Sequence, residues 1–288
     1  MKDHPIKPVP AKRAGPARKR PAKRKPIPWK RRVKDWRRRA DKIGRVVRAT
    51  PPAVRTIIVL ALAAGLFLLT NLVYHIVRKP TEMLYPVSGV LKKNPAETWR
   101  EYGPLFREYS TANISPELLA ALAQTEGTGD PIAHTYWRWR LTWPPFEMYK
   151  PASSAVGMYQ MTDGTFADAA RYCIRNHAVI ERDSGSCWSE DLYNRLLPSH
   201  AIELTAAHLD RSIAAIVGRQ DDQKATLQQK QDLAAITHLC GAGAARDFAR
   251  HGFRLTAGQM CGDHSAEIYV GRVTAMIRQF QRLSAEGG

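Results

Sequence analysis

A glutamate closes an apolar helical pattern in the segment ISPELLAALAQTEG. The Ser-Pro pair at 115–116 predicts a helix start, because Ser caps free amides and Pro at the first helical position loses no hydrogen bond. Leu118, Leu122 and Glu126 recur every four residues and share one stripe, and Gly127 can end the helix. On a core-facing stripe the carboxylate is desolvated, so we expect a raised pKa, as a general acid needs. The alternative is a solvated Glu126 at a frayed helix end.

A second motif, PASSAVGMYQMTDGTF, follows at 151–166. A helix-end Glu, then Gly-Met-Tyr-Gln-Met at 157–161 and a Thr-x-x-Thr-Phe turn, resembles the lytic transglycosylases of the soluble-lytic (SLT) type. These lysozyme-like enzymes cleave the glycan of bacterial peptidoglycan. The family usually has Glu-Ser and then Gly-Leu-Met-Gln-Ile or Leu, so Gly127 replaces Ser and Met158-Tyr159 replaces Leu-Met. The resemblance covers roughly the second two-thirds of the chain.

This resemblance implies a single-carboxylate mechanism without metal or cofactor. Glu126 would protonate the oxygen between N-acetylmuramic acid and N-acetylglucosamine, and would then accept the proton of the C6 hydroxyl that attacks C1. The product would be a 1,6-anhydro sugar. The expected saccharide-binding residues are Gln160, Met158 through its backbone, Gly157, Tyr269 from the motif EIYVGRV, and, as weaker candidates, Ser153 and Ser154.

Three other functions remain open at this stage. A hydrolytic muramidase on the same fold would require a second carboxylate, for which Asp163 is the candidate. A non-catalytic peptidoglycan-binding scaffold of an envelope machine would keep the groove without using Glu126. A nucleic-acid binder would act through the basic N-terminal tail, but its position before an apolar segment argues against this function.

The net charge of +18 is confined to the N-terminal part of the chain. Residues 1–55 hold 21 of the 44 Lys and Arg and 3 of the 26 Asp and Glu, so the remainder is neutral. Pro and like charges predict a largely disordered cytoplasmic tail. Within it, segment 29–48 is either a basic amphipathic helix or a solvated stretch. Either form would bind anionic inner-membrane lipid, and an envelope-machine partner is a further expectation.

Segment 56–77 contains no Asp, Glu, Lys or Arg. About 20 such residues suffice for a helix that crosses a bilayer. The excess of Lys and Arg before it predicts a cytoplasmic N-terminus and a single-pass inner-membrane anchor. Segment 78–94 is then expected to be a linker, and 95–288 a periplasmic, mainly α, lysozyme-like (goose-type/SLT) domain with a small β region.

All four cysteines follow the apolar segment, which favours disulfides in an oxidising compartment. They allow three pairings, and loop length alone favours Cys173 with Cys187 and Cys240 with Cys261. A zinc site is the other interpretation, although no Cys-x-x-Cys spacing supports it.

The segment HTYWRWRLTWPPFEMYK carries six aromatic residues directly after Glu126. Such rings could form one wall of a glycan groove, or fill the core beneath a long loop, which we expect for most of them. Trp137 and Trp139 alternate with Arg138 and Arg140, which predicts a short strand. The paired Arg side chains could also meet carboxylates of the substrate.

Helical patterns cover most of the remaining sequence. Asn94-Pro95 predicts a helix start, and the stripes after it include aromatic residues expected in the core. Further helices are predicted from Pro198, at 225–239 with a break at Gly241 and Gly243, and at 266–283.

Overall fold

The computed structural model describes residues 49–182, 187, 194–218 and 225–286, with four isolated positions before them (38, 41, 42 and 44). The chain divides into two compact units, 1–67 and 68–288. The described part is mainly helical, as predicted. The tail at 1–30 and most of the predicted amphipathic segment 29–48 lie outside the described residues.

Helix α2 (Pro52–Arg78) contains the apolar segment. Among the described residues it is the one helix long and apolar enough to cross a membrane. Almost none of its apolar stretch is buried by the rest of the chain. After it, segment 78–94, predicted as a linker, forms a short 3₁₀ helix η1 (Pro80–Val87) whose Glu82 is buried. An Asp130 oxygen accepts the Gly89 amide hydrogen at 2.7 Å, which attaches this segment to the domain.

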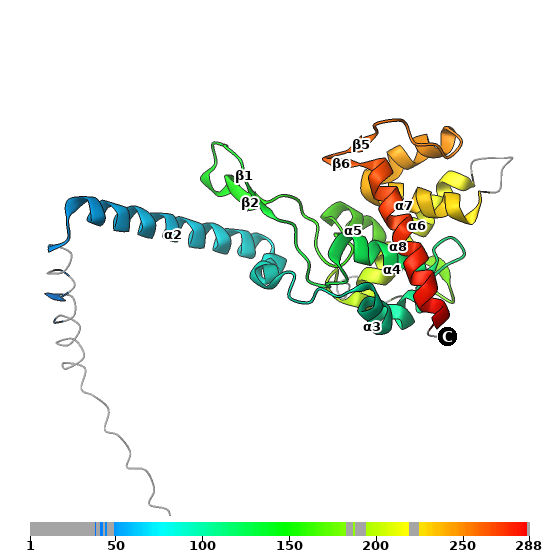
Figure 1. Ribbon diagram of the computed structural model, residues 1–288, viewed down its shortest axis with the longest axis horizontal. Helices are drawn as coiled ribbons and strands as arrows, with labels where there is room; N and C mark the ends of the chain where they lie inside the picture. Colours follow the sequence, from blue (N-terminus) through cyan, green and yellow to red (C-terminus); the bar gives the residue numbers. More distant parts are fainter. Residues whose placement is uncertain are drawn as a thin grey trace, which may run out of the picture. The chain divides into compact units, whose positions relative to one another are not determined.

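Two capped helices lead to the centre of the domain. Helix α3 (Pro95–Glu108) begins at Asn94 with a reciprocal capping box, as its sequence predicts. Helix α4 (Pro116–Gly127) begins where predicted, with the Ser115 hydroxyl accepting the Leu118 amide hydrogen. Six consecutive residues of α4, from 118 to 123, are fully buried. A helix that is apolar on all sides lies inside its domain, and α4 packs against both α3 and α8 (Figure 1).

Three longer helices carry most of the remaining core. They are α6 (Pro198–Val217), α7 (Leu227–Arg250) and α8 (Ala266–Glu286). Helices α8 and α6 contact α4, and α7 packs on both of them. Helix α7 is interrupted at Gly241, as predicted: this residue has a non-helical φ of 81°, and helical structure resumes after it to Arg250. Glycine adopts this backbone conformation easily because it has no Cβ. A short helix α5 (Asp163–Ala169) begins at a Thr162 cap.

In the described residues, the β structure consists of three two-stranded antiparallel hairpins. The first pairs β1 (Trp137–Trp139) with β2 (Tyr149–Pro151), in agreement with the strand predicted from the Trp/Arg alternation. The other two were not predicted: β3 (Tyr172–Arg175) with β4 (Ala178–Glu181), and β5 (Met260–Cys261) with β6 (His264–Ser265).

Two disulfides confirm the sequential pairing. Cys173 bonds to Cys187, and Cys240 bonds to Cys261. The second bridge ties the kink region of α7 to the β5–β6 hairpin that precedes α8. Since α7 and α8 carry the side chains beside Glu126 described next, this bridge holds one wall of the candidate site.

Candidate active site

Three helices bring one carboxyl, one phenol and one imidazole together. Glu126, in the last turn of α4, accepts a short hydrogen bond on Oε1 from the Tyr269 hydroxyl of α8. His238 of α7 places Nε2 3.8 Å from the same Oε1. Leu118 and Leu122 of the same stripe are fully buried, whereas the Glu126 side chain keeps 18% of its surface exposed. The stripe thus faces the core as far as Leu122 and leaves the Glu126 carboxyl partly exposed at the helix end.

The two oxygens of Glu126 differ in their surroundings. Tyr269 and His238 both lie beside Oε1. Within the described part of the chain, no donor contacts Oε2. A carboxyl held through one oxygen is fixed in orientation, and its second oxygen is free to give or take a proton. Such an oxygen can act as a general acid or base if a substrate proton comes within hydrogen-bond reach.

Tyr269 is suited to remain a proton donor. Burial, followed by the negative charge of Glu126 and their hydrogen bond, raises the pKa of Tyr269 well above its usual value. The phenol therefore stays protonated across the neutral range and keeps donating to Oε1. Tyr269 was singled out only by the family resemblance, since a Tyr on an apolar stripe is ordinarily a core residue.

Gly127 allows the end of α4 to touch the second motif. A Cβ on Gly127 would lie 2.7 Å from both the Cα and the carbonyl oxygen of Met158, closer than such atoms approach. The left-handed residue that ends the helix is Thr128 and not Gly127. The glycine is thus required for close packing, which is a different reason from the helix-ending role predicted from the sequence.

The 157–161 turn packs directly on the helix that carries Glu126. Gly157 has φ of 81°, and a Cβ there would meet the Arg195 carbonyl oxygen at 2.4 Å. Met158 is fully buried, so neither its side chain nor its backbone is exposed to a ligand. Gln160 donates its side-chain amide to the Ala133 and Gly157 carbonyls at 3.2 and 2.9 Å. In this structure, Gln160 therefore orders the turn.

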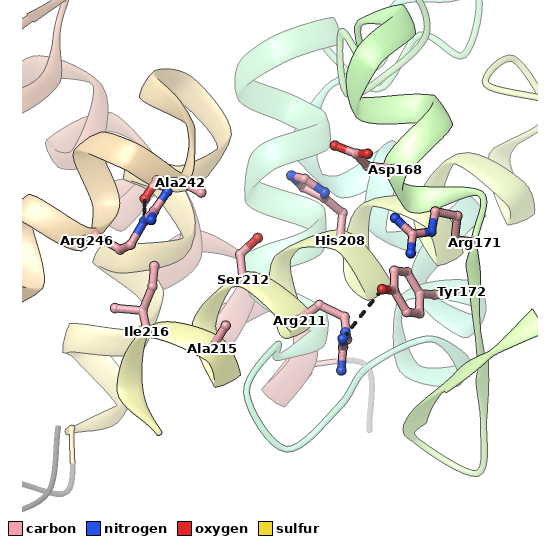
Figure 2. Close-up of a pocket in the computed structure, with 10 residues that line it drawn as sticks. All are labelled: Asp168, Arg171, Tyr172, His208, Arg211, Ser212, Ala215, Ile216, Ala242 and Arg246. Carbon is pink, nitrogen blue, oxygen red and sulfur yellow. Dashed lines mark hydrogen bonds between the residues drawn. The ribbon is translucent and has the colours of Figure 1, made fainter. Parts of the chain in front are cut away.

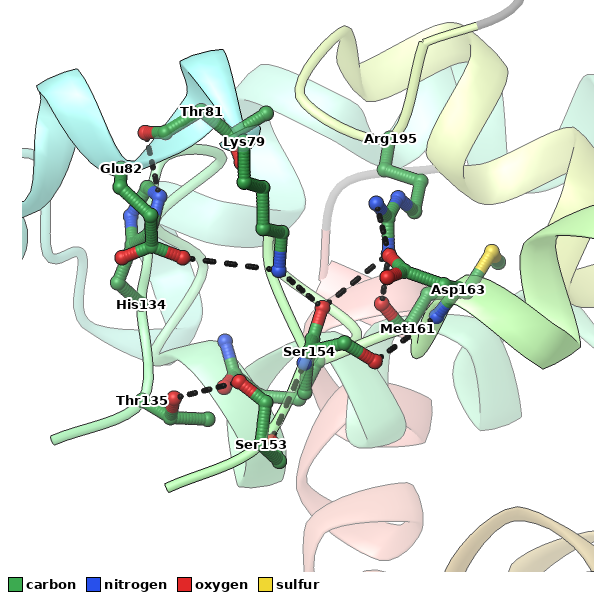
Figure 3. A network of polar contacts seen from close by, with 12 residues as sticks. Lys79, Thr81, Glu82, His134, Thr135, Ser153, Ser154, Met161, Asp163 and Arg195 are labelled. Atoms are coloured by element: carbon green, nitrogen blue, oxygen red, sulfur yellow. Dashed lines mark hydrogen bonds and ion pairs between the residues drawn. The ribbon is translucent and has the colours of Figure 1, made fainter. Parts of the chain in front are cut away.

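Ser153 and Ser154 belong to a polar network beside this turn (Figure 3). The Ser154 carbonyl accepts hydrogen bonds from Lys79 at 2.8 Å and from Arg195 at 3.2 Å. The Ser153 hydroxyl accepts the Ala155 amide hydrogen. Both serines thus have structural partners that hold the loop.

Asp163, the second carboxylate that a muramidase would need, is bound by a cation. Its Oδ1 lies 2.6 Å from the guanidinium of Arg195, although the carboxylate side chain is 60% exposed (Figure 3). The same guanidinium donates to the Met161 carbonyl at 2.8 Å. Asp163 is thereby tied to the loop, and its charge is balanced.

A pocket of about 410 Å³ opens between α5, α6 and α7 (Figure 2). Three of its lining residues are arginines, Arg171, Arg211 and Arg246, and its one carboxylate is Asp168. The rest of its lining includes His208. Within the described residues none of the three guanidiniums forms an ion pair, so the pocket suits an anion.

His208 connects this pocket to the Glu126 site. Burial, followed by the charge of His238, lowers the pKa of His208, whereas Asp168 raises it. The two imidazoles are therefore near enough to influence each other, and His238 in turn adjoins Glu126. His208 is neutral at pH 7 and faces the pocket.

Comparison with known proteins adds no assignment. No protein-family model matches this sequence, and no curated protein is significantly similar to it.

Neither His238 nor His208 was predicted from the sequence. His238 directly precedes the segment Leu-Cys-Gly-Ala-Gly, which aligns loosely with the Ala-Tyr-Asn-Ala-Gly motif of the resembled family. Its position beside that motif is the sequence feature that could have pointed to it. His208 lies on a helix stripe without any motif. In the described ranges, no three His, Cys, Asp or Glu side chains come together in a way that could hold a metal ion.

Proposed function

We propose that this protein is a peptidoglycan lytic transglycosylase with a lysozyme-like catalytic domain. The observation that carries the proposal is the Glu126 carboxyl, held through Oε1 by Tyr269 and open at Oε2, at the end of a buried helix. The family resemblance of the two motifs supplies the substrate class.

In the first step, protonated Glu126 would give its proton to the glycosidic oxygen as the bond from that oxygen to C1 of N-acetylmuramic acid breaks. The leaving N-acetylglucosamine then departs as an alcohol. The N-acetyl group of the muramic acid would stabilise the electron-poor C1. Tyr269 would keep donating to the new carboxylate, and His238 lies beside the same oxygen.

In the second step, the Glu126 carboxylate would take the proton of the C6 hydroxyl while the C6 oxygen forms a bond to C1. This closes the 1,6-anhydro ring and returns Glu126 to its protonated form. No water is consumed, and one carboxyl serves as acid and then as base.

Two features beyond Glu126 support this function. The nearest alternative, hydrolysis with Asp163 as a second carboxylate, receives no support from the structure because that side chain is engaged by Arg195. The Arg171, Arg211 and Arg246 pocket offers guanidiniums to the carboxylates that peptidoglycan carries on its lactyl and peptide groups.

We further propose that α2 anchors the enzyme in the bacterial inner membrane, with the basic tail in the cytoplasm and the catalytic domain in the periplasm. The length and apolarity of α2, the charge before it and the two disulfides after it support this placement.

The test is digestion of purified peptidoglycan by the full chain in detergent, with Glu126→Gln and Glu117→Gln assayed in parallel. Glu117 lies in the first turn of the same helix and serves as the matched control. Removing the general acid should lower cleavage by about a hundredfold or more, whereas Glu117→Gln should retain it. Equal cleavage by Glu126→Gln and the native chain would refute the proposal.

A further inference from the structure

The β1–β2 hairpin exposes a group of large apolar side chains. Leu141 and Trp143, near its tip, are 97% and 98% exposed, and Trp139 and Tyr136 are 60% and 64% exposed. The expectation that most rings of this segment fill a core is therefore wrong; of the tryptophans, Trp137 alone is buried. Figure 1 shows the hairpin standing clear of helices α3 to α8.

The tip of the hairpin is bonded to the last turns of α2. The Phe146 carbonyl accepts hydrogen bonds from Asn71 Nδ2 at 3.2 Å and from His75 Nε2 at 3.0 Å. The Phe146 ring stacks on Tyr74, with ring centres 4.8 Å apart. Asn71 and His75 are the strongly polar residues of the apolar segment, so the hairpin covers the groups that lipid could not solvate.

These contacts determine which part of helix α2 lies beside the hairpin. Near the hairpin base, Trp137 packs on Tyr85 and His75, whereas Phe146 at the tip reaches Asn71. Asn71 lies seven residues before the end of α2, a distance of about 10 Å along a helix axis. The tip is thus attached within the apolar segment and not beyond it.

The chemistry of the exposed tip matches a membrane interface. Tryptophan concentrates where apolar tails meet headgroups, and an adjacent cation can bind phosphate. The exposed tip segment 140–144 reads Arg-Leu-Thr-Trp-Pro and contains no carboxylate. Glu147, the nearest acidic residue, is paired with Lys150 at 2.6 Å.

We infer that the β1–β2 hairpin inserts Leu141 and Trp143 into the outer interfacial layer of the membrane that α2 crosses. The inference rests on the proposed anchoring by α2 and is independent of the chemistry at Glu126. It makes the hairpin a second attachment point, so that the catalytic domain is held against the membrane surface as well as tethered to it.

Site-specific photo-crosslinking of the full chain tests this inference. The chain would be reconstituted in vesicles of phosphatidylethanolamine and phosphatidylglycerol, with p-benzoylphenylalanine replacing Trp143, Leu62 or Ile268 in turn. Leu62 of α2 and Ile268 of α8 are 68% and 65% exposed, so the three positions are similarly accessible. Mass spectrometry then identifies what each probe has captured.

We expect lipid adducts at 143 and 62 in comparable yield, and only background at 268. Adducts at 62 without adducts at 143 would overturn the hairpin inference and leave the anchor intact. No lipid at either position would overturn the anchor itself. Capture of a second copy of the chain at 143, or of glycan when peptidoglycan is added, would overturn the inference in favour of that partner.

A second variant separates docking of the hairpin from folding. Asn71→Leu keeps α2 apolar but removes one donor to the Phe146 carbonyl. With the probe at 143, lipid adducts should fall while adducts at 62 and peptidoglycan cleavage persist. An unchanged yield of lipid adducts at 143 would contradict the role proposed for Asn71 in positioning the hairpin along α2.

Discussion

The α4 region and the β1–β2 hairpin contain similar apolar side chains in opposite environments. Residues 118 to 123 of α4 have no exposed surface, whereas Leu141 and Trp143 of the hairpin are almost fully exposed. The difference shows that apolarity alone does not locate a core. The α4 side chains are buried by neighbouring helices, whereas no described part of the chain covers the hairpin tip.

The largest expected effect comes from a matched pair of leucines. Leu122→Ala should lower the free energy of unfolding by about 2–5 kcal/mol, because it removes fully buried methyl groups and leaves a cavity. Leu141→Ala, in detergent, should change it by less than about 0.5 kcal/mol. Thermal unfolding of the full chain measures both. An equal loss of unfolding free energy in the two variants would mean that Leu141 is packed against the rest of the chain.

A second pair compares two hydroxyls. Tyr269→Phe removes the donor to Glu126 and should lower kcat for peptidoglycan cleavage by about tenfold to a hundredfold, as expected for a hydrogen bond to a charged group. Tyr159→Phe removes a buried donor to the Leu119 carbonyl and should lower the melting temperature instead. If Tyr269→Phe cleaves as fast as the native chain, Tyr269 has no part in catalysis.

A third pair concerns two glycines in helices. Gly127→Ala forces a Cβ against the Met158 backbone and should destabilise the chain by about 1–3 kcal/mol. Gly164→Ala in α5 meets no atom within 4 Å and should stabilise it by about 0.5–1 kcal/mol. Denaturant unfolding measures whether each substitution lowers or raises the free energy of unfolding. A neutral Gly127→Ala would contradict the close contact between α4 and the second motif.

The smallest effect is a pH dependence from His208. Its pKa is lower in the folded chain than the usual 6.5, because it is buried beside His238. As pH falls below 6.5, the unfolded chain binds a proton that the folded chain does not, so stability decreases. His208→Asn should reduce the decrease in melting temperature that the native chain shows between pH 7 and pH 5. An unchanged slope would show that another group causes the loss.

Much of the helical structure followed from local sequence signals. The caps at Asn94 and Ser115, the stripe ending at Glu126 and the position of α8 depend on residues adjacent in sequence, and the structure bears them out. The disulfide pairing agreed with loop length. These features could be predicted because a few neighbouring residues determine them.

What was missed depends on contacts between distant segments. The role of Gly127 requires Met158, and the hairpin that exposes Trp143 is attached through Phe146 to Asn71. His238 comes near Glu126 because α7 packs on α8, which in turn packs on α4. The β3–β4 and β5–β6 hairpins are too short to show a clear alternation.

The most direct test of the central claim is digestion of peptidoglycan by the full chain in water enriched in heavy oxygen, followed by mass spectrometry of the released muropeptides. If Glu126 delivers the C6 hydroxyl to C1, the products end in 1,6-anhydro-N-acetylmuramic acid, are one water lighter than hydrolytic products and carry no heavy oxygen. Products with a reducing muramic acid and one heavy oxygen each would contradict the account and identify a muramidase.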